Sequence, residues 1–178
     1  MTNSIRLFLL CSLLAPMFAL KAQPLIVDPP QHRNVRGTVI LDPEAKRNGD
    51  PVLGFLVGFS QQIYPIDQMV ISFGHLSSSD FEQNYVLLSF EEHFPISETV
   101  APYGSTGFGF MWTDDKRGDA DREGLFGQIA AGIIVQTSRH WAFFGEVNYM
   151  IGTSRMWLDH DKLVNRNLQF QAGFRYSF

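Results

Sequence analysis

The last eleven residues of the chain alternate strictly between two kinds of side chain. A helix would mix the two sets, whereas an extended strand places them on opposite faces. Segment 168–178 is therefore predicted to be a β-strand. Its apolar face carries Leu168, Phe170, Ala172, Phe174, Tyr176 and Phe178, and its polar face carries Gln169, Gln171, Gly173, Arg175 and Ser177.

Seven upstream segments show the same period of two. In each, bulky apolar residues occupy one face, and Gly, Ser, Gln and a few charged residues occupy the other. The pattern predicts eight strands in all, of which the first is the weakest. The seven upstream segments are 34–42, 52–64, 68–76, 84–94, 102–113, 124–137 and 140–152.

The connections between these segments fall into two kinds. The odd-numbered connections are polar and mostly long, and they hold more than half of the charged residues, whereas the even-numbered connections are short. Short turns at one end and long charged loops at the other are typical of outer-membrane barrels. We therefore predict an all-β fold, an eight-stranded antiparallel up-and-down transmembrane β-barrel. The odd connections are 42–51, 77–83, 114–123 and 153–166; the even ones are 64–67, 95–101 and 138–139.

A soluble carrier barrel of the lipocalin type is the alternative with the same strand count. A carrier turns its apolar face inward, and a membrane barrel turns it toward lipid. Eight strands enclose little space, which the small polar set fills better than the Phe, Trp and Leu set. We expect the polar face inside, with Trp112, Trp141, Tyr176 and Phe178 near the two membrane interfaces.

The first 22 residues have the organisation of a secretory signal peptide. Arg6 precedes an apolar run over 7–15, and Ala22 offers a small residue at the cleavage position. We predict a signal peptide at 1–22 and a barrel domain at 23–178. Cys11 lies in the signal segment, so the mature chain would contain no cysteine.

Composition excludes several other classes. The chain has 178 residues, of which 13% are aromatic and 16 are Phe, and its net charge is −4. After the N-terminus it has no apolar run long enough for a membrane-spanning helix, and its aromatic content argues against disorder. A pI near 5.7 without a basic stripe predicts no nucleic-acid partner. We expect no cofactor and no metal.

The C-terminal residues resemble a known outer-membrane assembly signal. Phe178, preceded at alternate positions by Tyr176, Phe174 and Phe170, resembles the terminal signal read by the outer-membrane assembly machinery. The mature chain as a whole resembles the small eight-stranded outer-membrane barrels of the OmpA, OmpX and OmpW type. The resemblance implies a Gram-negative outer membrane as the location and a monomeric barrel. Outer-membrane lipids, lipopolysaccharide and the assembly machinery would be its partners.

Charged residues on the predicted interior face form a first candidate site. Glu146 and Arg175 lie on neighbouring strands, and a charge away from water needs a partner, so we expect an ion pair between them. A proton or ion path is the alternative use of these side chains. The remaining predicted members of the polar network are Arg36, Glu91, Gln128, Gln169 and Gln171.

Three short motifs suggest ligands but lack essential parts. Segment 119–124 has the opening spacing of a calcium loop, but Ala130 stands where an EF-hand needs its bidentate Glu. Looser cation binding there, bridging lipopolysaccharide phosphates, is the remaining possibility. Segment 117–119 is an Arg-Gly-Asp tripeptide. Segment 91–93, Glu-Glu-His, does not bring three ligands together, because alternation sends Glu92 outward.

His75 and Ser77 suggest an enzyme, because an imidazole near a hydroxyl is the minimal hydrolase pair. Segment 74–77 is similar to a segment of the lipid A deacylase barrels. Those proteins carry their His-x-Ser on strand seven, where this chain has Asn148 and Met150. His75 and Ser77 are therefore residues to test, and no catalytic residue is assigned.

The expected function is non-enzymatic. Envelope structure, surface interaction through the extracellular loops and porin-like passage of small solutes remain open, with a lipid A-modifying esterase as the alternative. The fourth loop, with Met156, Trp157 and Leu158 amid charges, is the best candidate contact surface.

Overall fold

The computed structural model describes residues 33–47, 50–63, 66–77, 81–115, 122–153, 155, 157–159 and 162–178. The predicted signal peptide lies outside these residues. Within them, no helix is long and apolar enough to cross a membrane. The strands are β1 (Arg33–Arg47), β2 (Asp50–Gln62), β3 (Asp67–Ser77), β4 (Phe81–His93), β5 (Val100–Asp115), β6 (Arg122–Gln136), β7 (Trp141–Gly152), β8 (Trp157–Asp159), β9 (Lys162–Val164) and β10 (Arg166–Ser177).

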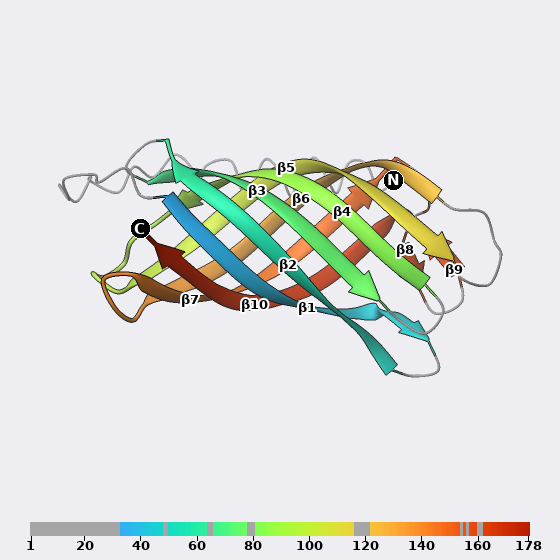
Figure 1. Cartoon of the computed structure of the whole chain (residues 1–178), viewed down its shortest axis with the longest axis horizontal. Coiled ribbons are helices and arrows are strands. Elements are labelled where there is room, and N and C mark those ends of the chain that lie inside the picture. The colour runs from blue at the N-terminus through green and yellow to red at the C-terminus, as the bar shows by residue number, and fades with distance from the viewer. Residues whose placement is uncertain are drawn as a thin grey trace, which may run out of the picture.

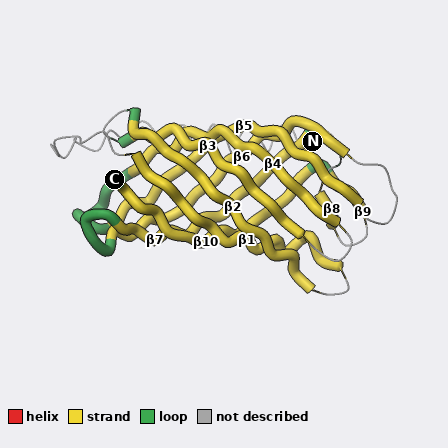
Figure 2. Tube along the Cα trace, in the orientation of Figure 1, coloured by secondary structure: helices red, strands yellow, loops and turns green. Residues whose placement is uncertain are grey.

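Eight of the described strands form a closed antiparallel barrel in the order β1-β10-β7-β6-β5-β4-β3-β2 (Figures 1 and 2). Chain neighbours pair along the sheet, and β1 pairs with β10 from Asn34↔Ser177 to Leu41↔Phe170. The predicted eight-stranded up-and-down barrel is thus confirmed. The short turns and the C-terminus lie at one end, called here the turn end, and the opposite end is the loop end.

The strands run further at the loop end than the sequence pattern predicts. β1 and β2 stay paired as far as Arg47↔Asp50, after a register shift between Asp42 and Arg47. Segment 42–51 is therefore mainly a β-hairpin extension, which projects from the barrel in Figure 1. The predicted fourth loop contains a further hairpin, β8–β9. The alternation ends where the apolar band ends, but the backbone ladder continues because its hydrogen bonds do not depend on side-chain polarity.

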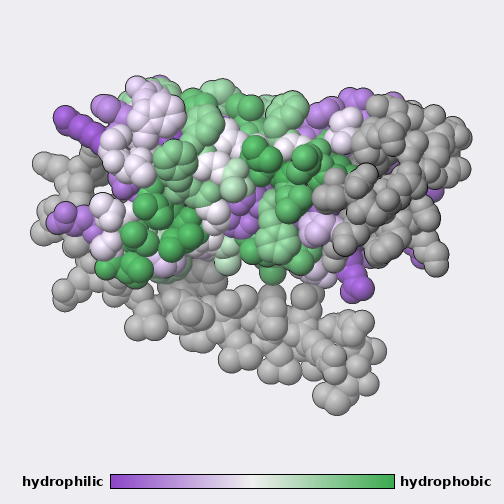
Figure 3. Space-filling view, turned by 90° about the horizontal axis from the view of Figure 1, so that it is seen from below, coloured by the Kyte–Doolittle hydropathy of each residue, from purple (hydrophilic) through white to green (hydrophobic). Residues whose placement is uncertain are grey.

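The outer face of the barrel is apolar over its middle. The face seen in Figure 3 is hydrophobic there and more hydrophilic toward the ends. A water-soluble domain rarely exposes a continuous apolar surface of this extent. Large exposed side chains on this outer surface include Val39, Leu53, Phe55, Phe59, Phe73, Phe90, Phe108, Leu125, Ile133, Phe143, Val147, Phe170 and Phe174.

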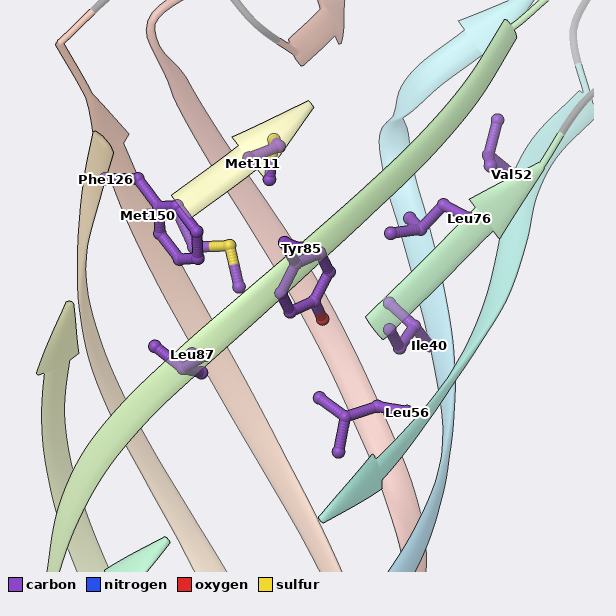
Figure 4. Close-up of a cluster of buried hydrophobic side chains, with 9 residues drawn as sticks. All are labelled: Ile40, Val52, Leu56, Leu76, Tyr85, Leu87, Met111, Phe126 and Met150. Atoms are coloured by element: carbon purple, nitrogen blue, oxygen red, sulfur yellow. The ribbon is translucent and has the colours of Figure 1, made fainter. Parts of the chain in front are cut away.

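The interior is only partly polar, which corrects the expectation of a small polar lining. An apolar cluster fills the half toward the loop end, with the Tyr85 ring near its middle (Figure 4). A second cluster, nearer the turn end, comprises Tyr103, Ile134, Ala142 and Phe144. The members of the first cluster are Ile40, Val52, Leu56, Leu76, Tyr85, Leu87, Met111, Phe126 and Met150.

Candidate functional sites

The interior ion cluster consists of Arg36 on β1, Glu91 on β4 and Arg175 on β10. Arg175 Nη2 donates to Glu91 Oε2 at 2.7 Å, and Arg36 Nη1 donates to Glu91 Oε1. All three residues are at most 4% exposed. One carboxylate therefore pairs with two guanidiniums across the lumen.

Neighbouring groups hold the two arginines in place. Arg36 Nη2 donates to Ser72 Oγ at 3.3 Å, and its guanidinium carbon lies 5.7 Å from the centre of the Phe144 ring. Arg175 Nη1 donates to Gln68 Oε1 at 3.0 Å. Buried charges stay ionised only where partners of this kind replace water. The ion cluster thereby joins β1, β3, β4 and β10 from inside.

Glu146 belongs to a separate group. Tyr103 Oη donates to Glu146 Oε2 at 2.6 Å, and Asn148 Nδ2 donates to Glu146 Oε1 at 2.7 Å. The predicted Glu146–Arg175 ion pair is wrong. The register places Glu146 opposite Gln171, whereas Arg175 is opposite Ala142, four residues further along the strand.

A third polar group lies toward the loop end around Asp42. Asn167 Nδ2 and Gln169 Nε2 donate to Asp42 Oδ2 at 2.6 and 3.4 Å. The alternation pattern places Asp42 at the end of a predicted strand. Its even number, shared with the interior residues Arg36 and Thr38, was the signal that it faces inward.

The structure buries every residue predicted for the interior network, but in separate groups. Gln128 Nε2 donates to Ser105 Oγ at 3.4 Å, apart from the ion cluster. Ser72, Tyr103 and Asn167 also contribute hydrogen bonds, and the sequence pattern does not single them out. The seven predicted residues, all buried, are Arg36, Glu91, Gln128, Glu146, Gln169, Gln171 and Arg175.

A polar cluster lies on the outer face of β3 and β4, near the loop end. His75 Nδ1 lies 2.8 Å from Asn84 Oδ1 and 3.8 Å from Glu82 Oε1. The His75 ring also packs on Phe55 of β2, with 5.2 Å between ring centres. Ser77 is exposed on the same face, two residues along β3. We call His75, Ser77, Glu82 and Asn84 the outer polar cluster.

The residues of the predicted assembly signal line the outer face of β10. Trp141 packs against Tyr176 and Phe174, with ring centres 4.9 and 5.6 Å apart. Phe178 is exposed, and its amide donates to the Arg33 carbonyl at 3.1 Å, beside the start of β1. Phe170 is likewise exposed. This arrangement leaves an aromatic row accessible along the last strand.

The described part of the chain contains no group of three His, Cys, Asp or Glu side chains placed to hold an ion. His93 Nε2 lies 3.5 Å from Glu91 Oε2, and the His93 ring stacks on Tyr103. Segment 117–119 and residues 119–121 of the calcium-like segment 119–124 lie outside the described residues.

No protein-family model matches the chain, and no curated protein does. Solved structures do match. The N-terminal β-barrel domain of Pseudomonas aeruginosa OprF has a TM-score of 0.66 and 12% identity, covering 83% of this chain and 98% of that domain. Neisserial surface protein A has a TM-score of 0.63 and 12% identity, covering 83% and 96%.

A de novo designed transmembrane β-barrel matches as well, with a TM-score of 0.58 and 15% identity, covering 85% of this chain and 98% of the design. These likenesses confirm the resemblance to small outer-membrane barrels at the level of the fold. That a designed chain shares the fold illustrates that a fold does not determine a function.

Proposed function

We propose that the protein is a monomeric outer-membrane barrel with a sealed lumen, and that it presents its loop-end segments at the cell surface for interaction. The observation that carries this proposal is the filled interior. The ion cluster and two apolar clusters occupy the space inside the strands. Eight-stranded barrels have interiors just wide enough for such filling.

The outer surface supports a location in a lipid bilayer. Exposed Phe, Leu, Ile and Val side chains surround the barrel, and Trp112 and Trp141 lie toward its opposite ends. The natural neighbours in the fold comparison, OprF and Neisserial surface protein A, support an outer-membrane location for this chain. Export would use the predicted signal peptide, and insertion would use the assembly machinery. Closure of the eight-stranded sheet leaves no open edge among its described strands, so the barrel wall needs no second copy to cover one.

The structure of the loop end supports a role in surface interaction. The β1–β2 extension projects there, and β8 of the β8–β9 hairpin contacts β1. Charged residues concentrate in the same segments. Of the three expected functions, solute passage through the lumen is the least supported, because side chains fill the lumen. Surface interaction is the best supported.

Cysteine accessibility tests the proposed orientation. The only Cys of the chain is Cys11, in the predicted signal peptide, so introduced cysteines would be unique in the mature protein. Arg122→Cys at the loop end should react with a membrane-impermeant maleimide on intact cells. Glu98→Cys, in an exposed turn at the other end, is the matched control and should react only after lysis.

The wild-type protein, purified and reconstituted in a planar bilayer, should show no steady porin-type conductance. Labelling of Glu98→Cys on intact cells would contradict the orientation. A stable open-channel current would contradict the sealed lumen.

A further inference from the structure

We propose that the lumen binds one monovalent alkali-metal ion, Na⁺ or K⁺, through the side-chain oxygens of three buried amides on β7 and β10. The amides are Asn148, Asn167 and Gln169, called here the amide triad. The ion would be held and not conducted, so the proposal goes beyond the surface interaction proposed above and does not depend on it. Three observations carry it: the orientation of the amides, their unpartnered oxygens, and the buried carboxylate beside them.

Two carboxylates determine which way the amides of the triad point. Asn148 Nδ2 donates to Glu146 Oε1 at 2.7 Å, and Asn167 Nδ2 donates to Asp42 Oδ2 at 2.6 Å. Gln169 Nε2 donates to the same Asp42 oxygen at 3.4 Å. An ionised carboxylate only accepts hydrogen bonds, so the amide nitrogen, which carries the hydrogens, must face it. The oxygen of each amide is therefore directed away from the carboxylate.

The three amide oxygens are buried and accept no hydrogen bond. Asn148 Oδ1, Asn167 Oδ1 and Gln169 Oε1 have no partner in the part of the chain that the structure describes. Each of these residues is at most 1% exposed. Buried polar atoms are nearly always satisfied, so unpartnered ones that occur together need an explanation such as a bound ion. The triad presents acceptors only, which suits a positively charged ligand.

The pairing register places the triad on one patch of the inner wall. Gln169 lies directly opposite Asn148, and Asn167 is the next inward-facing residue of β10 toward the loop end. Opposite residues of an antiparallel pair have Cβ atoms about 4.5–5.5 Å apart, and inward neighbours on one strand are about 7 Å apart. Asn and Gln side chains span such separations. Their three oxygens can therefore contact a single ion.

Glu146 supplies the charge that favours a cation at this patch over water. Its carboxylate is 6% exposed and forms no ion pair with any described residue. Glu91 differs, because it pairs with both buried arginines. The buried Asp, Glu and Arg side chains of the described residues comprise three carboxylates and two guanidiniums, an excess of one negative charge. Buried charges are normally paired or bound to a metal, and one monovalent ion would balance this excess.

The available ligands favour a monovalent ion over Ca²⁺. Carbonyl oxygens replace the hydration shell of K⁺ in channel filters and coordinate Na⁺ in transporters. Ca²⁺ takes about six to eight oxygens, usually with several carboxylates among them. Both oxygens of Glu146 already accept hydrogen bonds, from Tyr103 at 2.6 Å and from Asn148 at 2.7 Å. A bound alkali ion would link β7 to β10 from inside the barrel.

The first experiment measures stability against alkali-ion concentration. The mature protein is folded into zwitterionic phosphatidylcholine vesicles, and NaCl or KCl replaces choline chloride at constant ionic strength. A ligand that binds only the folded state stabilises it increasingly as its concentration exceeds the dissociation constant. The urea midpoint should therefore rise as the alkali ion replaces choline, and the salt with the larger shift identifies the preferred ion. Equal midpoints in all three salts would overturn the proposal.

The second experiment separates ion binding from a structural role of the amides. Gln169→Met removes one ligand oxygen and should weaken the apparent ion affinity by at least about tenfold, as expected when a metal site loses a supporting group. Asn148→Asp supplies a charged oxygen and should strengthen the ion response, a gain that a purely structural amide would not show. Gln83→Met is the matched control and should leave the ion response unchanged. Gln83 is a buried glutamine on β4, across the barrel from β10, and its Nε2 donates to Thr113 Oγ1.

Crystals of the wild-type barrel soaked with Tl⁺, a stand-in for K⁺, would locate the ion directly. Anomalous scattering should give a peak in contact with the oxygens of the amide triad. Heat-modified gel mobility shows which variants are folded, and the wild-type titration and the Tl⁺ map decide the question even if Gln169→Met does not fold. Water at the triad without an anomalous peak would overturn the proposal, as would an undiminished ion response in folded Gln169→Met.

Discussion

At the scale of single residues, Glu91 matters more than its sequence context suggests. Its carboxylate is the shared anion of two buried guanidiniums from β1 and β10. Glu146, equally buried, receives hydrogen bonds from the neutral groups of Tyr103 and Asn148. Two carboxylates on the same interior face therefore contribute to stability in different ways.

Glu91→Gln should be much more damaging than Glu146→Gln. The first change leaves Arg36 and Arg175 without an anion, which costs about 3–5 kcal/mol for a broken buried pair. The second keeps an acceptor for Tyr103 and should cost about 1 kcal/mol. Urea unfolding in lipid vesicles, followed by tryptophan fluorescence, measures both. Glu92→Gln, on the outer side of the same strand, is the control, and equal losses at 91 and 146 would refute the assignment.

The same residues show what the sequence could predict. The side on which each residue lies follows from its parity within an alternating segment, so the sequence predicts that Arg36, Glu91, Glu146 and Arg175 point inward. The sequence does not predict the partner of each residue, because pairing depends on the stagger between strands. Arg175 meets Glu91, 84 positions away in the chain, rather than Glu146 on the adjacent strand.

At the scale of elements, glycines paired with aromatic residues shape the strands. In each of these pairs the ring of one strand covers the glycine opposite, where a side chain would otherwise collide with it. A Cβ on Gly74 would lie 2.2 Å from Tyr85 Cζ, and one on Gly109 would lie 2.5 Å from Phe126 Cζ. The interior cross-strand pairs of this kind are Gly74–Tyr85, Gly109–Phe126, Gly132–Tyr103 and Gly173–Phe144.

Gly74→Ala should destabilise the barrel by about 1–3 kcal/mol, because the added methyl displaces the Tyr85 ring from the centre of the apolar cluster. Gly127→Ala is the matched control, since its added Cβ would approach only the Gly107 carbonyl oxygen, at 4.0 Å. Equilibrium unfolding of both variants provides the comparison. Combining Gly74→Ala with Tyr85→Leu should cost less than the sum of the single changes. Strict additivity would argue against ring contact as the cause.

Elements were predictable where side chains alternate and less so where they do not. The pattern located all eight barrel strands. It assigned 42–51 and 153–166 to loops, because polar residues there give no periodic signal, and so it missed the β1–β2 extension and the β8–β9 hairpin. It also overlooked apolar interior positions such as Leu56, Met111 and Met150, which lie among polar neighbours of the same parity.

At the scale of the whole molecule, polarity is arranged for a lipid surrounding. Phe108 is 60% exposed near the middle of β5, and Ile96 is 70% exposed in a turn. For a barrel in water, the two positions would be equivalent. In a bilayer, only the first meets hydrocarbon.

Phe108→Arg should therefore destabilise the folded barrel in vesicles by about 2–4 kcal/mol, the cost of a lipid-facing Arg near the bilayer centre. Ile96→Arg should have an effect below about 0.5 kcal/mol, as is usual for an exposed surface position. Urea titrations in phospholipid vesicles measure both. Equal tolerance of the two substitutions would favour the soluble-carrier alternative.

Closure of the barrel between β1 and β10 also determines the order in which the chain can reach its final state. Ser177 and Asn34, joined by a side-chain hydrogen bond, are 143 positions apart, and pairing at such separation is slow. Until β10 arrives, β1 and β7 are open edges, and Arg36 shares Glu91 with no second arginine. Pairing of β10 thus removes the last open edges of the sheet and also adds Arg175 to the interior ion cluster. We therefore expect the pairing of β10 with β1 to be the last and slowest step of barrel closure.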